Sequence, residues 1–231
     1  LHALADLCAR QNLWFHVDAA YGGAFALTSR GRAVLGGIGR ADSVTLDPHK
    51  GFFLPYGTGA LLVRDRELLR RAHHVDAEYL PRMQDEPDLV DYADLSAELS
   101  RDWRGLRVWL PLKMHGAAAF RDALDEKLDL ARDAARALVE IPHVQLVAAP
   151  ELSLLAFRVA PPGMDDAAAD AFTRRVMSRV NQRQRVLLTG TVVRGRFVIR
   201  MCILSFRTHA EHVALAVEDV RAAIHGEGSA A

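Results

Sequence analysis

The chain has 231 residues, and half of them are hydrophobic, which is enough for a substantial core in one large or two small domains. Its 29 basic and 29 acidic residues balance and are interspersed, so no basic field indicates a nucleic acid or an anionic membrane as a partner. No apolar run reaches the ~20 residues of a membrane-spanning helix. The two cysteines, Cys8 and Cys202, lie far apart in apolar surroundings, so we expect buried free thiols and a cytoplasmic protein.

The first segments combine a helical pattern with a short apolar run. Residues 1–8 repeat apolar side chains at helix spacing. An apolar run at 13–18 then ends on an acid and is expected to be a strand, with His16 and Asp18 on one face. His-x-Asp is also half of a metal site, but nothing nearby completes the ligands, so we expect no metal.

A second apolar run, at 43–47, has the same layout and leads through Pro48 and His49 to Lys50. Short apolar runs bounded by turn residues are typical of buried parallel strands. Ligands of open α/β sheets bind at the carboxyl ends of such strands. Asp18 and Lys50 are therefore expected at one edge of a sheet, on two strands joined by one crossover.

An acid and a lysine at neighbouring strand ends suit pyridoxal phosphate. This cofactor forms a Schiff base with a lysine amine, and a carboxylate keeps its ring nitrogen protonated. Phe52 and Phe53 could supply the desolvation that makes the Lys50 amine nucleophilic. The other two lysines, Lys113 and Lys127, lie on predicted helices. The pattern alone leaves open that the acid only caps a helix and that the lysine is a solvated surface charge.

Two stretches carry a resemblance to a known family. His16-Val-Asp-Ala-Ala-Tyr-Gly and Asp47-Pro-His-Lys resemble the signature of the group II pyridoxal-phosphate-dependent amino-acid decarboxylases, which include the aromatic-L-amino-acid, tyrosine, histidine and glutamate decarboxylases. The resemblance covers nearly the whole chain: residues 76–80 look like the mobile catalytic loop, 100–109 like the hinge and 195–201 like a late strand of the small domain. It implies an α/β fold, in which the end of a fold type I transferase large domain, with a mostly parallel sheet, precedes a small α+β domain.

Four residues are expected to hold the cofactor. Lys50 would carry it, and Asp18 would bind its ring nitrogen. The small side chain of Ala20 would let the flat ring lie close. By the resemblance His49 would donate to the phosphate, although a turn residue without a role stays open.

Two further residues are expected to act on the substrate. The resemblance implies that Tyr79, in an irregular acidic stretch, protonates the substrate carbon after carbon dioxide leaves. Relatives with phenylalanine there release an aldehyde, so a tyrosine favours plain decarboxylation, although an anchoring aromatic stays open. Arg200 interrupts an apolar strand, and a buried arginine must be paired. Either it lies near the substrate carboxylate, as the family implies, or it forms an internal ion pair with a helix acid.

The remaining pattern predicts the rest of the fold. Asp65 is expected to cap a helix that ends at His74, and Pro111 is expected to kink a partly helical segment at 101–114. Strands alternating with helices in the C-terminal half predict an antiparallel sheet with helices on one face. The other expected elements are helices at 29–38, 117–139, 165–182 and 209–224 and strands at 60–63, 143–148, 152–159, 186–193 and 196–204.

We interpret the chain as the C-terminal half of such a decarboxylase. The expected parts are the end of the cofactor domain (1–74), the mobile loop and hinge (75–104), the small domain (105–225) and a disordered tail (226–231). The turn that binds the phosphate and the histidine that stacks on the ring would precede it, so the chain alone is expected to be inactive and the whole enzyme a homodimer. By the resemblance the small-molecule substrate is expected to be an L-amino acid, with a preference for aromatic residues or a broad specificity. The alternatives are an aldehyde synthase or aminotransferase of the same fold, and a non-catalytic half-length chain.

Overall fold

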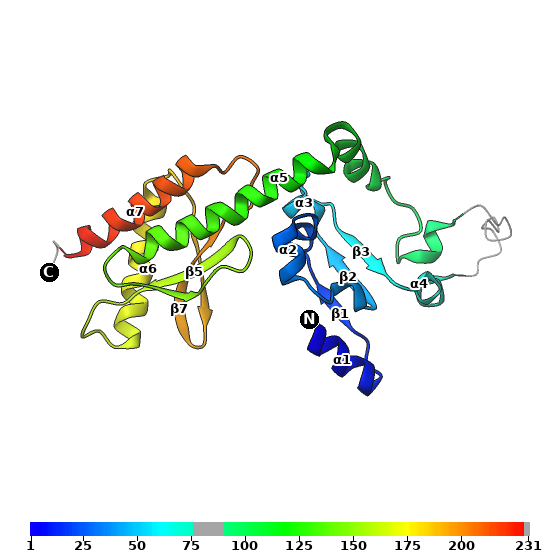
Figure 1. Ribbon diagram of the computed structural model, residues 1–231, viewed down its shortest axis with the longest axis horizontal. Coiled ribbons are helices and arrows are strands. Elements are labelled where there is room, and N and C mark those ends of the chain that lie inside the picture. The colour runs from blue at the N-terminus through cyan, green and yellow to red at the C-terminus, as the bar shows by residue number, and fades with distance from the viewer. Residues whose placement is uncertain (76–89, 229–231) are drawn as a thin grey trace. The chain divides into compact units, whose positions relative to one another are not determined.

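The computed structural model describes residues 1–75 and 90–228, which form two compact units (Figure 1). Unit 1 consists of Leu1–Ala24 and Leu35–Gly116, and unit 2 consists of Phe25–Val34 and Ala117–Ala231. The units divide between Gly116 and Ala117, whereas the sequence suggests a boundary at residue 105. The four-part domain organisation stays a prediction.

The sheet of unit 1 has three strands in the order β1-β2-β3. After α1 (His2–Gln11), β1 (His16–Asp18) pairs in parallel with β2 (Ser43–Leu46), and Asp18 lies opposite Thr45. The alternation predicted for β1 is present, because Val17 is buried while the residues on either side of it are exposed. This places both functional segments on neighbouring strands, as expected.

The third strand adds an antiparallel pair to this sheet, and the mostly parallel sheet of the whole large domain stays a prediction. β3 (Ala60–Val63) runs antiparallel to β2, so one of the two strand pairs is antiparallel. A parallel return needs a long crossover, usually a helix. The connection from 47 to 59 contains only the one-turn helix α3 (Pro48–Gly51), which is too short for such a crossover.

The described helices in the first 100 residues are short. Asp65 caps α4 (Arg66–His73) as predicted, since its Oδ1 accepts the backbone N–H of Glu67 at 3.0 Å. The helix expected at 29–38 is shorter than predicted: α2 (Ser29–Val34), in unit 2, ends before Gly37, whose φ of 91° does not continue a right-handed helix. The remaining short elements are 3₁₀ turns, η1 (Gly23–Leu27), η2 (Ile38–Arg40) and η4 (Tyr92–Leu95).

The helix α5 (Gly105–Val139) is broken by a glycine rather than by its proline. It continues through Pro111, and the non-helical residue inside it is Gly116, with φ 73° and ψ 155°. A residue without Cβ adopts this conformation at little cost, so the break occurs there. The break coincides with the division between the units and with the start of the helix expected at 117–139, while the kink at Pro111 stays a prediction.

Unit 2 contains the predicted antiparallel sheet with the strand order β4-β5-β7-β6. Its strands are β4 (Val144–Ala148), β5 (Leu154–Val159), β6 (Thr189–Val193) and β7 (Arg196–Cys202), and every neighbouring pair is antiparallel. Alternate residues of β5 and β7, such as Phe157 and Ile199, are fully buried in one cluster with apolar residues of α5, α6 (Asp166–Gln182) and α7 (Ala210–Gly228). Figure 1 shows these helices beside the sheet. α7 includes Gly226, where the disordered tail was expected to begin.

Several polar expectations need correction. Cys8 is half-buried and Cys202 is exposed, and both are free, so the thiols are unpaired as expected but are not buried. Lys127 was expected to be an ordinary helix charge, yet its side chain is fully buried, where Nζ donates to Glu126 and to the carbonyl of Thr208. In the described parts of the chain, no helix combines the length and apolarity needed to cross a membrane.

Asp219 on α7 is a fully buried acid that two arginines neutralise. Its carboxylate accepts hydrogen bonds from Arg185, which also forms an ion pair with it, and from Nη1 of Arg183 at 2.8 Å. The Arg185 hydrogen bond, followed by that of Arg183, holds the pKa of Asp219 below its usual value. The stability that this group contributes is thus fully present above the unfolded pKa of ~3.9 and is lost as the pH falls through the folded pKa.

We expect Asp219→Asn to lower the free energy of unfolding by about 1.5–3 kcal/mol at pH 7, because charge-assisted hydrogen bonds to a buried group are lost. The difference from the wild type should shrink as the pH falls below ~4, because the unfolded wild-type chain then takes up a proton on Asp219 while the folded carboxylate is still ionised. Urea unfolding across this pH range measures both effects. Glu218→Gln is the control, since Glu218 is mostly exposed and contacts the same Arg185, and it should cost at most about 0.5 kcal/mol.

Candidate functional site

The carboxyl ends of β1 and β2 form one edge of the unit 1 sheet. Asp18 ends β1, and β2 leads into Asp47 and α3, which carries His49 and Lys50. Because the two strands are parallel and adjacent, these side chains belong to the same edge. The Asp18 carboxylate is exposed, and its Oδ1 accepts the backbone N–H of Ala20 at 3.1 Å. The predicted arrangement of the edge is therefore present.

His16 lies on the same face as Asp18 and is held by hydroxyl groups of β2. Its Nδ1 is 2.7 Å from Oγ of Ser43, and its Nε2 is 3.2 Å from Oγ1 of Thr45. Trp14 Nε1 also donates to Ser43 at 2.9 Å. Both ring nitrogens of His16 are thus engaged, and within residues 1–75 and 90–228 no three His, Cys, Asp or Glu side chains form a metal-binding group.

Lys50 is held by a carboxylate that the sequence analysis left without a role. Nζ of Lys50 lies 2.7 Å from Oδ2 of Asp47, in an ion pair three residues apart. The Lys50 side chain is 40% exposed and that of Asp47 is 20% exposed. Phe52 and Phe53 are half-buried. The lysine is therefore partly withdrawn from solvent, but it is paired rather than isolated in an apolar setting.

His49 is fixed by a backbone carbonyl. Its Nδ1 lies 2.7 Å from the carbonyl oxygen of Thr58, and because a carbonyl only accepts, this nitrogen carries a proton. Tyr56 packs edge-on against the ring, with 4.7 Å between the ring centres. In neutral His49 the remaining Nε2 is an acceptor, so donation from Nε2 to an anion requires the protonated ring. Oδ2 of Asp47 lies 3.9 Å from this Nε2.

Glycines allow the loop after β1 to pack tightly at this edge. A Cβ on Gly51 would lie 2.4 Å from Cβ of Ala24, and a Cβ on Gly23 would lie 2.0 Å from Cδ2 of Leu46. Gly51 has to lack a side chain because the atom it would meet is a Cβ, whereas at Gly23 the end of the flexible Leu46 side chain would have to move. The loop that follows Asp18 is thereby packed directly against the elements that carry Lys50.

Of the two other predicted site residues, one belongs to unit 2 and one lies outside the described residues. Arg200 belongs to β7 of unit 2, is half-buried, and contacts Sγ of Cys202 at 3.6 Å. Among the described residues Arg200 forms no ion pair with a helix acid, so the alternative of an internal ion pair is not supported. Arg158 on β5 forms such pairs instead, with Asp166 and Asp170 of α6. Tyr79 lies outside the described residues.

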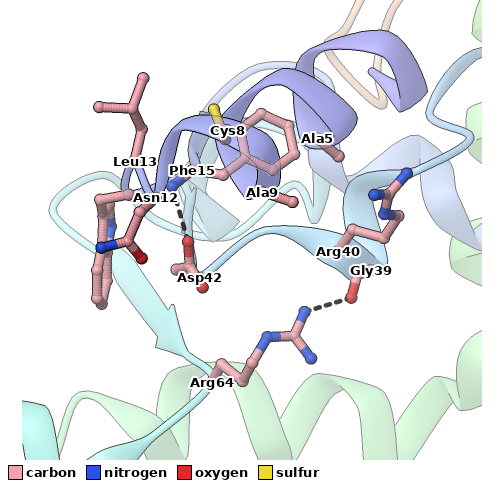
Figure 2. A pocket seen from close by; sticks show the side chains of 11 residues that line it. Ala5, Cys8, Ala9, Asn12, Leu13, Phe15, Gly39, Arg40, Asp42 and Arg64 are labelled. Atoms are coloured by element: carbon pink, nitrogen blue, oxygen red, sulfur yellow. Dashed lines mark hydrogen bonds between the residues drawn. The ribbon is translucent and has the colours of Figure 1, made fainter.

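A pocket of about 570 Å³ lies at the opposite edge of the same sheet. It is lined by the end of α1 and by residues that precede β1 and β2 or follow β3 (Figure 2). Its charged groups already serve the fold: Asp42 accepts the backbone N–H of Phe15 at 2.7 Å, Arg64 donates to the carbonyl of Gly39, and Arg40 pairs with Asp6. We assign it no ligand.

Asp47 is the residue of this edge that the sequence analysis missed. An aspartate directly before a proline at the first helical position is usually a helix cap, so the pattern gives it a local explanation. The signal that indicates more is its spacing, because residues three apart in a helical turn are neighbours. Together the edge offers an amine, two carboxylates and an imidazole, which suit a ligand with a carbonyl carbon, a cationic ring and an anionic group.

Comparisons with known proteins agree with this chemistry. The model of the pyridoxal-dependent decarboxylase conserved domain matches residues 1–160. An aromatic-L-amino-acid decarboxylase from Bacillus atrophaeus is 33% identical over 92% of this chain and 45% of its own length. A phenylacetaldehyde synthase from Arabidopsis thaliana is 27% identical over 92% of this chain and 44% of its own. A crystal structure of an Oryza sativa TDC with PLP and tryptamine superimposes with a TM-score of 0.90 and 27% identity, over 97% of this chain and 47% of that one. The chain thus spans about half the length of the curated relatives it matches.

Proposed function

The chain belongs to the pyridoxal-dependent decarboxylase family. We therefore propose that it provides the part of the active site that contains Lys50, in an enzyme that decarboxylates an L-amino acid to its amine and carbon dioxide. The observation that supports this most directly is the sheet edge, where Asp18 ends one parallel strand and Lys50 follows the next. The two units would then be the end of the cofactor domain and a small C-terminal domain.

The residues at this edge fit pyridoxal phosphate by their chemistry. When bound, the cofactor supplies an electron-withdrawing ring that accepts the electron pair of the breaking bond. Lys50 offers a partly exposed amine to its aldehyde, and Asp18 offers an exposed carboxylate to its ring nitrogen. Ala20 leaves room beside a flat ring, and His49 in its protonated form can donate Nε2 to the phosphate.

The substrate is proposed to be aromatic, or one of a broad range of L-amino acids. A named aromatic-L-amino-acid decarboxylase among the relatives supports this lean. We propose that Arg200 binds the substrate carboxylate, since the residue is half-buried and its guanidinium has no carboxylate partner among the described residues. A cytoplasmic homodimer is proposed for the whole enzyme, without nucleic-acid or membrane partners.

The second candidate is an aldehyde synthase of the same fold. The phenylacetaldehyde synthase among the relatives supports this alternative. The two reactions differ in what happens at the substrate carbon once carbon dioxide has left. We propose that Tyr79 protonates this carbon, as a positioned phenol can, and that the product is therefore the amine. Incubating the active enzyme with aromatic amino acids and measuring amine, aldehyde and peroxide together decides between the candidates.

The test of the proposed function is the site of cofactor attachment. We expect borohydride reduction of the cofactor-loaded enzyme, followed by peptide mapping, to place the adduct on Lys50. Lys113 and Lys127 are the internal controls, since one is exposed and the other is fully buried. An adduct on either of them, with Lys50 unmodified, would contradict the proposal.

A further inference from the structure

The ion pair at Lys50 indicates a function for Asp47 that the proposed reaction does not itself require. Oδ2 of Asp47 lies 2.7 Å from Nζ of Lys50, within hydrogen-bonding distance. The same oxygen is 3.9 Å from Nε2 of His49. One carboxylate thus faces the two side chains of α3 that are proposed to meet the cofactor.

The local backbone does not explain the position of this carboxylate. Asp47 occupies the N-cap of α3, yet its side chain makes no capping hydrogen bond. The N–H groups that a cap would satisfy are directed elsewhere: that of His49 to the carbonyl of Thr58 at 3.5 Å, and that of Lys50 to the carbonyl of Asp47 at 2.8 Å. Asp65, by contrast, uses its side chain to cap α4. The Asp47 side chain is therefore committed to the lysine rather than to the helix.

We propose that Asp47 is a positioning residue that holds the Lys50 ammonium in an ion pair and has to release it before the amine can react with a carbonyl ligand. The inference rests on the proposed attachment of the cofactor to Lys50. The pair has to separate because Nζ cannot bond to a carbonyl carbon while it remains an ammonium bound to the carboxylate. Both partners are partly exposed, so the pair is weak enough for an incoming ligand to disrupt.

The experiment compares the reactivity of individual lysines in the cofactor-free protein. Reductive methylation with formaldehyde and cyanoborohydride, quantified by peptide mapping, reports the rate at Lys50 relative to exposed Lys113. We expect Asp47→Asn, which removes the charge, to raise this ratio about two- to fivefold. Asp47→Glu keeps a carboxylate and should leave the ratio within about twofold of the wild type. An unchanged or lower ratio in Asp47→Asn would overturn the proposal.

Ionic strength provides a second test that needs no variant. Salt weakens a partly exposed ion pair, so raising it from about 0.05 to 0.5 M should increase the Lys50 to Lys113 ratio in the wild-type protein. In Asp47→Asn the ratio should not respond to salt. A wild-type ratio that is insensitive to salt would also overturn the proposal, even if the variants do not fold. Formaldehyde reacts with a lysine without any cofactor site, so these two tests are independent of the borohydride mapping with pyridoxal phosphate. A failure of the borohydride mapping would count against the proposed function, and not against the ion pair of Asp47.

Discussion

Asp18→Asn is expected to lower the rate of amine formation by the active enzyme by about 100-fold or more, while the protein stays folded. The amide can still accept the N–H of Ala20 through its oxygen, and the side chain is exposed, so little stability is at risk. What is lost is the negative charge proposed to face the ring nitrogen, and removing one preorganised electrostatic partner of a reacting group costs about 10²–10³ in rate. Amine release and the near-ultraviolet absorbance of the bound cofactor are the two measurements.

Asp42→Asn is the matched control for this effect. Asp42 directly precedes β2 and, like Asp18, accepts a backbone N–H with its carboxylate. It lies at the opposite edge of the sheet, in the pocket of Figure 2. It should change the rate by no more than about twofold. If Asp18→Asn kept more than a tenth of the wild-type rate, Asp18 would not be the partner of the ring nitrogen.

The second large effect is expected on stability, at a buried ion pair in unit 2. Arg158 on β5 is almost fully buried; it donates to Oδ1 of Asp166 at 2.9 Å and to Oδ1 of Asp170 at 3.1 Å. Its Nε is also buried and has no partner among the described residues. Asp170 in addition accepts the backbone N–H of Phe197 on β7 at 2.9 Å. Asp170 therefore ties α6 to two strands and compensates a buried charge.

We expect Asp170→Ala to lower the free energy of unfolding by roughly 3–5 kcal/mol, because it leaves a buried guanidinium only half compensated. Asp170→Asn should cost less, since its amide oxygen can still accept from Phe197. Adding Arg158→Met to Asp170→Ala should recover part of the loss, because the uncompensated charge is then gone. Urea unfolding of the three variants measures this, and a loss below about 1 kcal/mol for Asp170→Ala would show that Arg158 finds compensation elsewhere.

Much of the fold could be read from local patterns. Short apolar runs bounded by turn residues predicted β1 and β2, the pattern of the C-terminal half predicted its helices and strands, and Asp65 was correctly expected to cap α4. These features depend on residues close in sequence, such as the side chain of Asp65 and the N–H of Glu67. The expected positions of Asp18 and Lys50 at one edge followed from the same local information together with the geometry of parallel strands.

The errors occurred where a choice between two local outcomes depended on conformation. The helix expected at 29–38 ends early, since α2 stops at Val34 and Gly37 has a φ of 91°. The direction of β3 was left open, because it depends on how much chain returns from β2, and the apolar pattern of 60–63 does not contain that information. Apolar surroundings in sequence also suggested that both cysteines are buried, whereas exposure depends on what packs around them in space.

The sequence was therefore sufficient to identify the family, the strands and longer helices, and the sheet edge at which Asp18, Ala20, His49 and Lys50 were expected. The folded structure alone decided the partners of the buried charges: Lys127 with the carbonyl of Thr208, and Arg158 with Asp170. The physical reason is that secondary structure follows from side-chain periodicity along the chain. A buried charge, in contrast, requires a partner in three dimensions, and that partner can be as far away in sequence as Thr208 is from Lys127.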